Sequence, residues 1–310
     1  MKLWPNAELL VDKLHKPIGR LIPNYPLASS SWFRVGGMAE VMFFPEDVHD
    51  LAIFLQKLPK DISYCVLGNK SNILIRDYGI PGIVISLGKT FATIEVVDGN
   101  KILSGCSVLD KKLSSFALQN NIGGFSFYNS IPGSVGGAIK MNAGAFDKET
   151  KDFLIEVTLL DRSGIIYKVK SSLLDFKYRS SNIPKETICV SALYQGYCSQ
   201  YDKIYDEMLS MKNLRNSSQP LREKTGGSTF KNTESKKAWE LIELSGCRGL
   251  SVGGASVSKK HCNFIINNGN ATACDIESLG KLIISKVESV TGIKLEWEIK
   301  CIGVGPKTET

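Results

Sequence analysis

The chain has 310 residues, of which 43% are hydrophobic and 22% are charged, and its formal net charge is +7. This balance is ordinary for a protein with a buried core, and the length suggests about two domains. The longest apolar runs are far too short to cross a bilayer, which predicts no membrane insertion. Pro5, Glu8 and Asp12 interrupt the N-terminal stretch where a signal peptide needs an unbroken apolar segment, so we expect a cytoplasmic protein.

The cysteines and the basic residues both point away from specialised sites. The eight cysteines form no C-x-x-C pair and no zinc-ligand spacing, so we expect small buried residues such as Cys65 and no metal site. The lysines and arginines are scattered, with no basic block interleaved with aromatic residues, which predicts no nucleic-acid partner. A few cations directed at the phosphates of a small ligand would give the same excess of charge.

The first half of the chain alternates strand-like and helix-like segments. Residues 39–45 read as a strand and residues 46–58 as an amphipathic helix. The β-rich runs at 63–68 and 82–88 each end in glycine. A further helix is expected over residues 108–120, started by Asp110.

The second half continues with an α+β pattern. Residues 153–160 and 165–169 flank the turn sequence DRSG and predict a hairpin. Helices are expected at 205–216, 238–244 and 275–290, and the alternation at 294–303 predicts a strand. The loop at 217–228 is a candidate domain boundary. The last helix has an apolar face made of Ile276, Leu279, Leu282, Ile283, Val287 and Val290.

Two glycine-rich stretches, at 68–85 and 131–146, are candidates for anion binding. Glycines allow backbone N–H groups to approach a ligand closely, and Ser71, Asn72, Ser134 and Asn142 add side-chain donors. Tight turns that need positive φ are the alternative explanation. The density of glycine in the second stretch favours a ligand.

The sequence TGGSTFKN places Ser228 after a pair of glycines. Serine is a candidate nucleophile, but such a serine needs a base, usually histidine. The chain has three histidines, and none has an obvious relation to Ser228.

These stretches together resemble the flavin-dependent UDP-N-acetylenolpyruvoylglucosamine reductases. The resemblance runs from SSWFRVGG at 30–37 to EIKCIG at 298–303, nearly the whole chain. It passes in order through the loop at 68–85, IPGSVGGAIKMNAGA, YRSS at 178–181, GGSTFKN, the stretch at 238–273 and EWEIK. The chain is most similar to the shorter, type II form of this family.

The resemblance implies an α+β protein with a PCMH-type FAD-binding fold of two α/β subdomains and a smaller α+β substrate-binding domain. The first FAD-binding subdomain would comprise residues 1–85 with 300–310, and the second residues 86–212. The substrate-binding domain would comprise residues 213–299.

The resemblance also implies a reaction, in which NADPH and FAD reduce the enolpyruvyl double bond to give UDP-N-acetylmuramate for peptidoglycan synthesis. Ser228 would then be a general acid that protonates C2 after hydride transfer to C3, which needs no histidine. Arg179 and Glu298 would stabilise the enolate, Arg179 as a clamp for the carboxylate and Glu298 as a protonated hydrogen-bond donor.

The family motifs further assign binding residues in this chain, which we expect to be a monomer. Tyr178, Lys231, Asn232 and Ser256 would bind the UDP-sugar. FAD would be bound, without a covalent tether, by Gly68, Asn69, Lys70, Ser71, Asn72, Ile131, Pro132, Gly133, Ser134, Gly136, Gly137, Asn142, Ala143 and Gly144.

The chain departs from the family pattern at three positions. The first flavin loop usually reads G-x-G-S-N, and here Lys70 stands at the second glycine. If this position needs positive φ, lysine strains it by about 1 kcal/mol; alternatively, Lys70 pairs with the FAD diphosphate. Ser256 replaces a glutamine and Lys300 replaces a common arginine.

Two other hypotheses remain open from the sequence. Another PCMH-fold FAD oxidoreductase would act on a different small molecule. A nucleic-acid-binding module rests on the net charge alone and predicts salt-sensitive binding without flavin.

Overall fold

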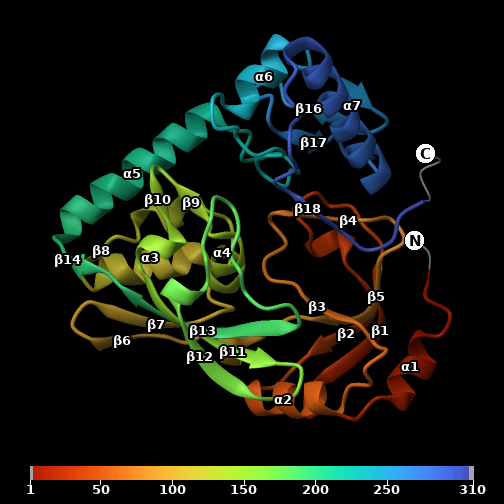
Figure 1. The fold of residues 1–310 in the computed structure, drawn as a ribbon, viewed down its shortest axis with the longest axis vertical. Helices are drawn as coiled ribbons and strands as arrows, with labels where there is room; N and C mark the ends of the chain where they lie inside the picture. Colours follow the sequence, from red (N-terminus) through yellow and green to blue (C-terminus); the bar gives the residue numbers. More distant parts are fainter. Residues whose placement is uncertain (1–2, 307–310) are drawn as a thin grey trace.

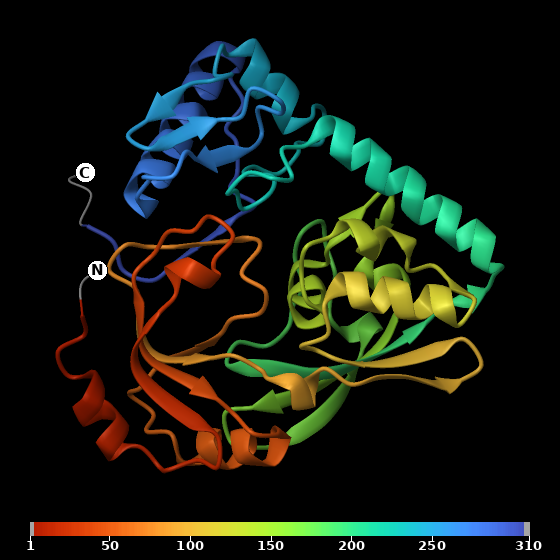
Figure 2. The same ribbon diagram turned by 180° about the vertical axis from the view of Figure 1, so that it is seen from behind.

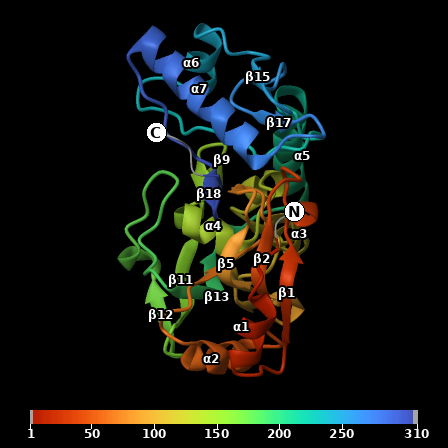
Figure 3. The same ribbon diagram turned by 90° about the vertical axis from the view of Figure 1, so that its right-hand side faces the viewer.

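The computed structural model describes residues 3–306 and arranges them in three groups, each around its own sheet (Figure 1). The two groups that contain the first half of the chain lie side by side, and the third group sits across one end of them (Figure 3). The long helix α5 (Tyr201–Ser218) runs along the outside from the second group to the third, as the view from behind shows (Figure 2). The expected α+β class is confirmed.

The first group is built on a four-stranded sheet in the order β1-β2-β5-β3. β1 is antiparallel to β2, and the other pairs are parallel. Its elements are α1 (Ala7–Lys13), β1 (Arg20–Pro26), β2 (Met38–Phe44), α2 (Val48–Lys57), β3 (Tyr64–Val66) and β5 (Ile80–Ile85). The side chain of Asp47 accepts a hydrogen bond from the N–H of Asp50 and caps α2. The predicted helix and strands of this region are confirmed to within a few residues.

The second group is built on a five-stranded antiparallel sheet in the order β12-β11-β13-β7-β6. The predicted hairpin is confirmed, because Leu160 pairs with Ile166. The elements are β6 (Ile94–Asp98), β7 (Lys101–Gly105), α3 (Asp110–Gln119), β8 (Ile122–Gly123), α4 (Val135–Met141), β9 (Gly144–Ala145), β10 (Lys148–Glu149), β11 (Leu154–Asp161), β12 (Ile166–Lys170), β13 (Thr187–Gln195) and β14 (Tyr197–Cys198).

The third group packs α6 and α7 against a small antiparallel sheet in the order β15-β16-β17. Its elements are α6 (Ala238–Leu244), β15 (Ser251–Val252), β16 (Ala255–Val257), β17 (Ile265–Asn267) and α7 (Ala273–Thr291). α7 begins after Thr272, which forms a capping box with Asp275. The predicted helix 238–244 is confirmed residue for residue.

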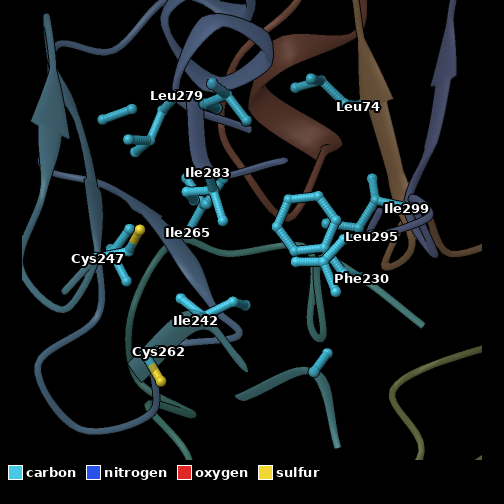
Figure 4. Close-up of a cluster of buried hydrophobic side chains, with 14 of the residues drawn as sticks. Leu74, Phe230, Ile242, Cys247, Cys262, Ile265, Leu279, Ile283, Leu295 and Ile299 are labelled. Carbon is cyan, nitrogen blue, oxygen red and sulfur yellow. The ribbon is translucent and has the colours of Figure 1, made fainter. Parts of the chain in front are cut away.

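The core of the third group also includes side chains from the first group. Leu74 lies at the edge of this cluster, on the same side as Phe230 and Ile299 (Figure 4). Leu74 belongs to β4 (Ile73–Ile75), which pairs in parallel with β18 (Lys300–Ile302), the last strand of the chain. The C-terminal strand therefore ties the third group back to the first.

Short 3₁₀ helices complete the connections. They are η1 (Ala28–Ser30), η2 (Lys89–Phe91), η3 (Ser126–Ser130), η4 (Thr150–Asp152) and η5 (Ser171–Leu173).

Two of the predicted domain boundaries coincide with the end or the start of a strand, and one falls within a helix. The boundary after residue 85 coincides with the end of β5, and the one before residue 300 with the start of β18. The boundary at 212/213 falls inside the continuous helix α5. Residues 1–2 and 307–310 of the first predicted subdomain lie outside the described residues, and the three-domain division stays a prediction.

Several local predictions were wrong. Residues 135–141, expected within a glycine-rich loop, form α4, because burial of Val135, Ala138 and Ile139 in the core outweighs the low helix propensity of the glycines there. Of the strand expected at 294–303, only residues 300–302 are a strand, since 295–299 make isolated contacts with the segment around Phe230.

Predictions of burial were also wrong at some positions. On α7, Leu282 and Val290 are 36% and 58% exposed, because the buried face is narrower than the sequence suggested. All eight cysteines are free thiols, but Cys198 is exposed and Cys65 only half-buried. Asp110 begins α3 as expected, yet its side chain makes no capping hydrogen bond.

Candidate active site

The two predicted cofactor loops contact each other. The side-chain amide of Asn69 donates to the carbonyl oxygen of Pro132 (3.1 Å). A Cβ atom added to Gly68 would stand 2.5 Å from Oγ of Ser134, so a larger residue there would displace the Ser134 hydroxyl group. Segments 63 positions apart in the sequence thus form one surface.

Lys70 has the left-handed conformation that the family's glycine predicts, with φ of 53°. A lysine there is strained by about 1 kcal/mol relative to glycine. Its ammonium group donates only a long hydrogen bond, 3.4 Å, to the carbonyl oxygen of Gly68. Burial lowers its pKa, and residues 3–306 offer it no ion pair. This half-buried, unpaired cation on a main-chain cradle fits an anionic group such as the FAD diphosphate.

The glycines of the second loop have different structural reasons. A Cβ at Gly133 would stand 2.3 Å from Oδ2 of Asp110, and one at Gly144 would stand 2.5 Å from the carbonyl oxygen of Lys148. Gly136 packs against Cys106, whereas Gly137 has almost open space. Gly144 is therefore required by the backbone beneath the loop, whereas Gly133 lies close to the Asp110 side chain. Gly137 leaves its face of the main chain uncovered.

Asn142 supports the loop from inside the protein. It is fully buried, ends α4 in the left-handed conformation, and donates to Oε2 of Glu149 (2.9 Å) and to the carbonyl oxygen of Lys177 (3.1 Å). Its side-chain oxygen accepts from the N–H of Lys151. Both amide donors are taken, which corrects the expectation that this side chain offers a donor to a ligand.

The structure brings Arg179 and Glu298 together, although they lie 119 positions apart along the chain. Nε of Arg179 donates to Oε1 of Glu298 (2.9 Å), and Nη2 donates to the carbonyl oxygen of Gly144 (3.1 Å). The guanidinium carbon lies 4.7 Å from the centre of the Tyr178 ring. Arg179 thus connects the predicted catalytic glutamate with the end of the second cofactor loop.

Glu298 is held in a desolvated position. Its side chain is only 15% exposed, and burial raises its pKa above the usual range. Arg179, Lys231 and Lys300 oppose this effect by stabilising the charged form. Burial within the protein is therefore the main cause of the raised pKa of Glu298.

Ser228 lies on a segment that runs against the Glu298 segment. The N–H of Glu298 donates to the carbonyl oxygen of Thr229 (2.9 Å), and the N–H of Lys231 donates to that of Glu296 (2.9 Å). The half-buried Ser228 is the residue before Thr229. The pairing brings Ser228, Arg179 and Glu298 into one region of the molecule.

The same region touches the first cofactor loop. The side-chain amide of Asn72 donates to the carbonyl oxygen of Glu298 (3.3 Å), and the N–H of Lys300 donates to the carbonyl oxygen of Asn72 (3.1 Å). Residues from all three groups of elements therefore converge on Glu298.

The predicted substrate-binding residues have protein partners already. Lys231 forms an ion pair with Glu296 (3.1 Å), and the side-chain oxygen of Asn232 accepts from the N–H of Ala238 at the start of α6. Ser256 donates to Oδ1 of Asn268 (3.0 Å). The Asn232 amide group stays available, because only its oxygen is used in that bond.

The residues that support the Ser228 segment were expected from the sequence to be structural or to flank the substrate-binding domain, without a specific contact. The buried Asn263 side chain accepts from the N–H of Phe230 (3.0 Å) and donates to its carbonyl oxygen (2.9 Å). Its neighbour His261, which the sequence did not favour as a catalyst, has a pKa lowered by burial and packs edge-on against Phe264. Nothing in the sequence distinguishes such a clamp from an exposed asparagine.

Residues 3–306 contain no candidate metal site and no candidate membrane span. No group of three His, Cys, Asp or Glu side chains there could hold a metal ion. No helix in the described part of the chain is long and apolar enough to cross a membrane.

Comparisons with known proteins agree with the geometry. A model of the FAD binding domain matches residues 39–170, and a model of the UDP-N-acetylenolpyruvoylglucosamine reductase C-terminal domain matches residues 219–302. The UDP-N-acetylenolpyruvoylglucosamine reductase of Parvibaculum lavamentivorans is 45% identical over 295 residues, which is 95% of each chain. That of Methylorubrum extorquens is 47% identical over 287 residues, 92% of this chain and 93% of the relative.

A solved structure supports the same relationship. The crystal structure of the UDP-N-acetylenolpyruvylglucosamine reductase from Thermus caldophilus matches with a TM-score of 0.80 and 30% identity, covering 93% of this chain and all of that chain. The fold is thus the PCMH-type FAD-binding fold expected from the sequence, and the cofactor is FAD. The chain belongs to the UDP-N-acetylenolpyruvoylglucosamine reductase family of FAD-dependent oxidoreductases.

Proposed function

We propose that this protein reduces UDP-N-acetylglucosamine enolpyruvate to UDP-N-acetylmuramate with NADPH, as a step in the synthesis of peptidoglycan precursors. Family membership supports the reaction class. The single observation that carries the mechanism is the convergence of Arg179, Glu298 and the Ser228 segment beside both cofactor loops. This convergence favours the reductase over the two other hypotheses considered from the sequence.

FAD, when bound, supplies the hydride that is added to C3 of the enolpyruvyl group. The residues that we propose to hold it line the two loops. They are Gly68, Asn69, Lys70, Ser71 and Asn72, with Ile131, Pro132, Gly133, Ser134, Gly136, Gly137, Ala143 and Gly144, and with Asn142 acting only as support. Lys70 is the one cation in this set.

Arg179 binds the carboxylate of the enolpyruvyl group. Its planar guanidinium matches a carboxylate, and its position is fixed by the contacts with Gly144 and Tyr178. A substrate carboxylate competes with Glu298 for this guanidinium. Glu298 then loses its main stabilising cation while it stays buried, so it takes up a proton and becomes a hydrogen-bond donor. Both groups stabilise the negative charge that develops on the carboxylate.

Ser228 supplies the proton at C2. Addition of hydride to C3 leaves an electron pair at C2 that is delocalised into the carboxylate, and this carbon is basic enough to accept a proton from a hydroxyl. A positioned general acid contributes roughly 10²–10⁴-fold to the rate. Ser228 needs no histidine for this step, since it acts as an acid and not as a nucleophile.

The nucleotide sugar is bound by Tyr178, Lys231, Asn232 and Ser256. Lys231 can exchange its exposed partner Glu296 for a substrate diphosphate at little cost, because such ion pairs are weak. The free amide group of Asn232 can donate to a uracil carbonyl or a phosphate oxygen. We place this monomeric enzyme in the cytoplasm, with residues 213–299 as its substrate-binding domain.

The visible absorbance of the purified protein tests this function. A flavin spectrum that bleaches with NADPH under anaerobic conditions, and returns when UDP-N-acetylglucosamine enolpyruvate is added, is the expected result. Bleaching that NADPH produces but the UDP-sugar does not reverse contradicts the proposed substrate. A spectrum that dithionite bleaches but NADPH does not contradicts the proposed reductant.

A further inference from the structure

Buried polar groups without hydrogen-bond partners are concentrated under the second cofactor loop. Within residues 3–306, five buried side-chain oxygen atoms lack a partner, and four of them belong to Asp110, Ser114 and Tyr194. Ser114 lies one turn along α3 from Asp110, on the same face of the helix. Native proteins leave few such groups unsatisfied, so their accumulation in one place requires an explanation.

Asp110 faces the beginning of the cofactor segment. Its N–H donates to the carbonyl oxygen of Gly133 (3.1 Å), and its Oδ2 occupies the space next to Gly133 that a Cβ would need. Two more hydrogen bonds align these segments, from Val135 to Val108 and from Gly136 to Cys106. The carboxyl group of Asp110 therefore fills the space beside Gly133 that the side chain of a larger residue would need.

The polar groups continue toward the other end of α4. The rings of Tyr194 and Tyr128 are 6.3 Å apart, and the Tyr128 hydroxyl donates to Oγ1 of Thr150 (2.9 Å). That threonine donates to the carbonyl oxygen of Ala143 (2.9 Å). Buried polar side chains thus occupy the region between Gly133, before α4, and Ala143, after it, and hydrogen bonds connect Tyr128, Thr150 and Ala143.

We propose that Asp110 is a positioning residue for FAD, whose carboxyl group joins Ser114 and Tyr194 in a buried network that fixes both ends of the cofactor segment 131–144. The proposal rests on the proposed function in one respect, namely that this segment contacts FAD. Asp110 itself is fully buried and acts through the Gly133 backbone.

The surroundings of the carboxyl group favour its neutral form. The titratable groups around it are Tyr128, Tyr194 and Cys106, all of them neutral acids, while Lys111 and Lys112 are exposed. Burial without a cation raises the pKa of Asp110 well above its usual range. A protonated carboxyl group can donate one hydrogen bond and accept others, which matches the hydroxyls of Ser114 and Tyr194, directly or through a buried water.

A double-mutant cycle on FAD affinity tests the coupling between Asp110 and Gly133. The dissociation constant of FAD is measured from the quenching of flavin fluorescence by apoprotein. Gly133→Ala is expected to weaken binding by about tenfold or more in the wild-type background. In the Asp110→Ala background, where the space is vacated, the same change is expected to cost less than about threefold.

Asp110→Asn is the matched control, since it keeps the shape and removes only the ability to ionise. This variant is expected to bind FAD within about threefold of wild type and to tolerate Gly133→Ala as poorly as wild type does. It also gives a test that does not depend on the folding of Asp110→Ala.

A raised pKa in the folded state means that stability is greatest at acidic pH and is lost as pH rises toward that pKa. Asp110→Asn should therefore melt roughly 5 °C above wild type at pH 8, with little difference near pH 4.

Two results would overturn the proposal and are distinguishable. If Gly133→Ala weakens FAD binding equally in both backgrounds, or if Asp110→Asn loses FAD as Asp110→Ala does, Asp110 does not position the segment, while the cofactor role of the segment stands. If Gly133→Ala leaves FAD binding unchanged in wild type, the segment does not contact FAD, and the proposed cofactor residues fall together with Asp110.

Discussion

The two sides of the site are built by different means. The cofactor loops depend on the main chain, through close approaches at Gly68, Gly133 and Gly144 and left-handed residues at Lys70 and Asn142. The side formed by Arg179, Glu298 and Lys231 depends on charged side chains in partly buried ion pairs. We therefore expect substitutions in the cofactor loops to alter FAD affinity, and substitutions among the charged side chains to alter turnover.

The largest effect is expected from Ser228→Ala. The removal of the proposed acid should slow flavin reoxidation by the enolpyruvyl substrate by roughly 10²–10⁴-fold. Flavin reduction by NADPH and the dissociation constant of FAD should not change. Stopped-flow absorbance measures both half-reactions, and Ser285→Ala, which changes an exposed serine on α7 of the same group, serves as the control. Normal reoxidation in the Ser228 variant would remove its catalytic role.

Arg179→Leu should reduce kcat by about 10²–10³-fold, because the charge on the substrate carboxylate loses its main stabilising cation. Arg179→Lys should recover only part of this loss, since an ammonium group cannot form the two-point contact. Steady-state kinetics separate kcat from KM. A change confined to KM would show that Arg179 binds ground state and transition state alike.

The pH dependence of turnover distinguishes the proposed form of Glu298. Because burial raises its pKa, the protonated form is present at acidic pH and is lost as pH rises through that pKa. Wild-type kcat should therefore fall on the alkaline side, by about tenfold for each pH unit above the pKa. Glu298→Gln keeps a donor at every pH and should lose this limb of the profile. An unchanged alkaline limb in that variant would assign it to another group.

In the first cofactor loop, Lys70→Gly should lower the affinity for FAD without lowering the stability of the protein. Loss of the cation should weaken FAD binding by roughly five- to tenfold, equivalent to about 1–1.4 kcal/mol. The melting temperature of the apoprotein should hold or rise, because the left-handed strain of lysine disappears. Lys70→Arg keeps a cation and should bind FAD normally. Riboflavin has no phosphate and should bind the wild-type protein and Lys70→Gly equally. If riboflavin binding weakens to the same extent, the cation does not act on the diphosphate.

The smallest effect is expected from Glu296→Gln. The side chain of Glu296 is 74% exposed, so its ion pair with Lys231 should contribute less than about 0.5 kcal/mol to the free energy of unfolding. Chemical denaturation measures this contribution, with Lys231→Gln as the partner variant. A much larger loss would show that the charged side of the site is also a structural element.

Many of the local elements could be predicted from the sequence alone, and the proposed chemistry of the site follows from it as well. Helix 238–244 and the hairpin around DRSG follow from short-range patterns and were predicted correctly. Positive φ at residue 70 was raised only as a condition, on the basis of the family's glycine, and the structure shows it. Ser228, Arg179 and Glu298 were found through motifs that the chain shares with its family. Short-range patterns suffice here because capping, turn geometry and φ preferences act within a few residues.

The contacts between those residues are visible only in the tertiary structure. The same holds for the polar groups that already have hydrogen-bond partners within the protein. Three features depend on packing between different segments of the chain. They are the ion pair of Glu298 with Arg179, the hydrogen bonds of Asn142 and the burial of the Asp110 carboxyl group. α4 was missed because burial of its apolar residues in the core outweighs the low helix propensity of its glycines. Burial and hydrogen-bond partners are properties of the packed chain, so no local pattern can specify them.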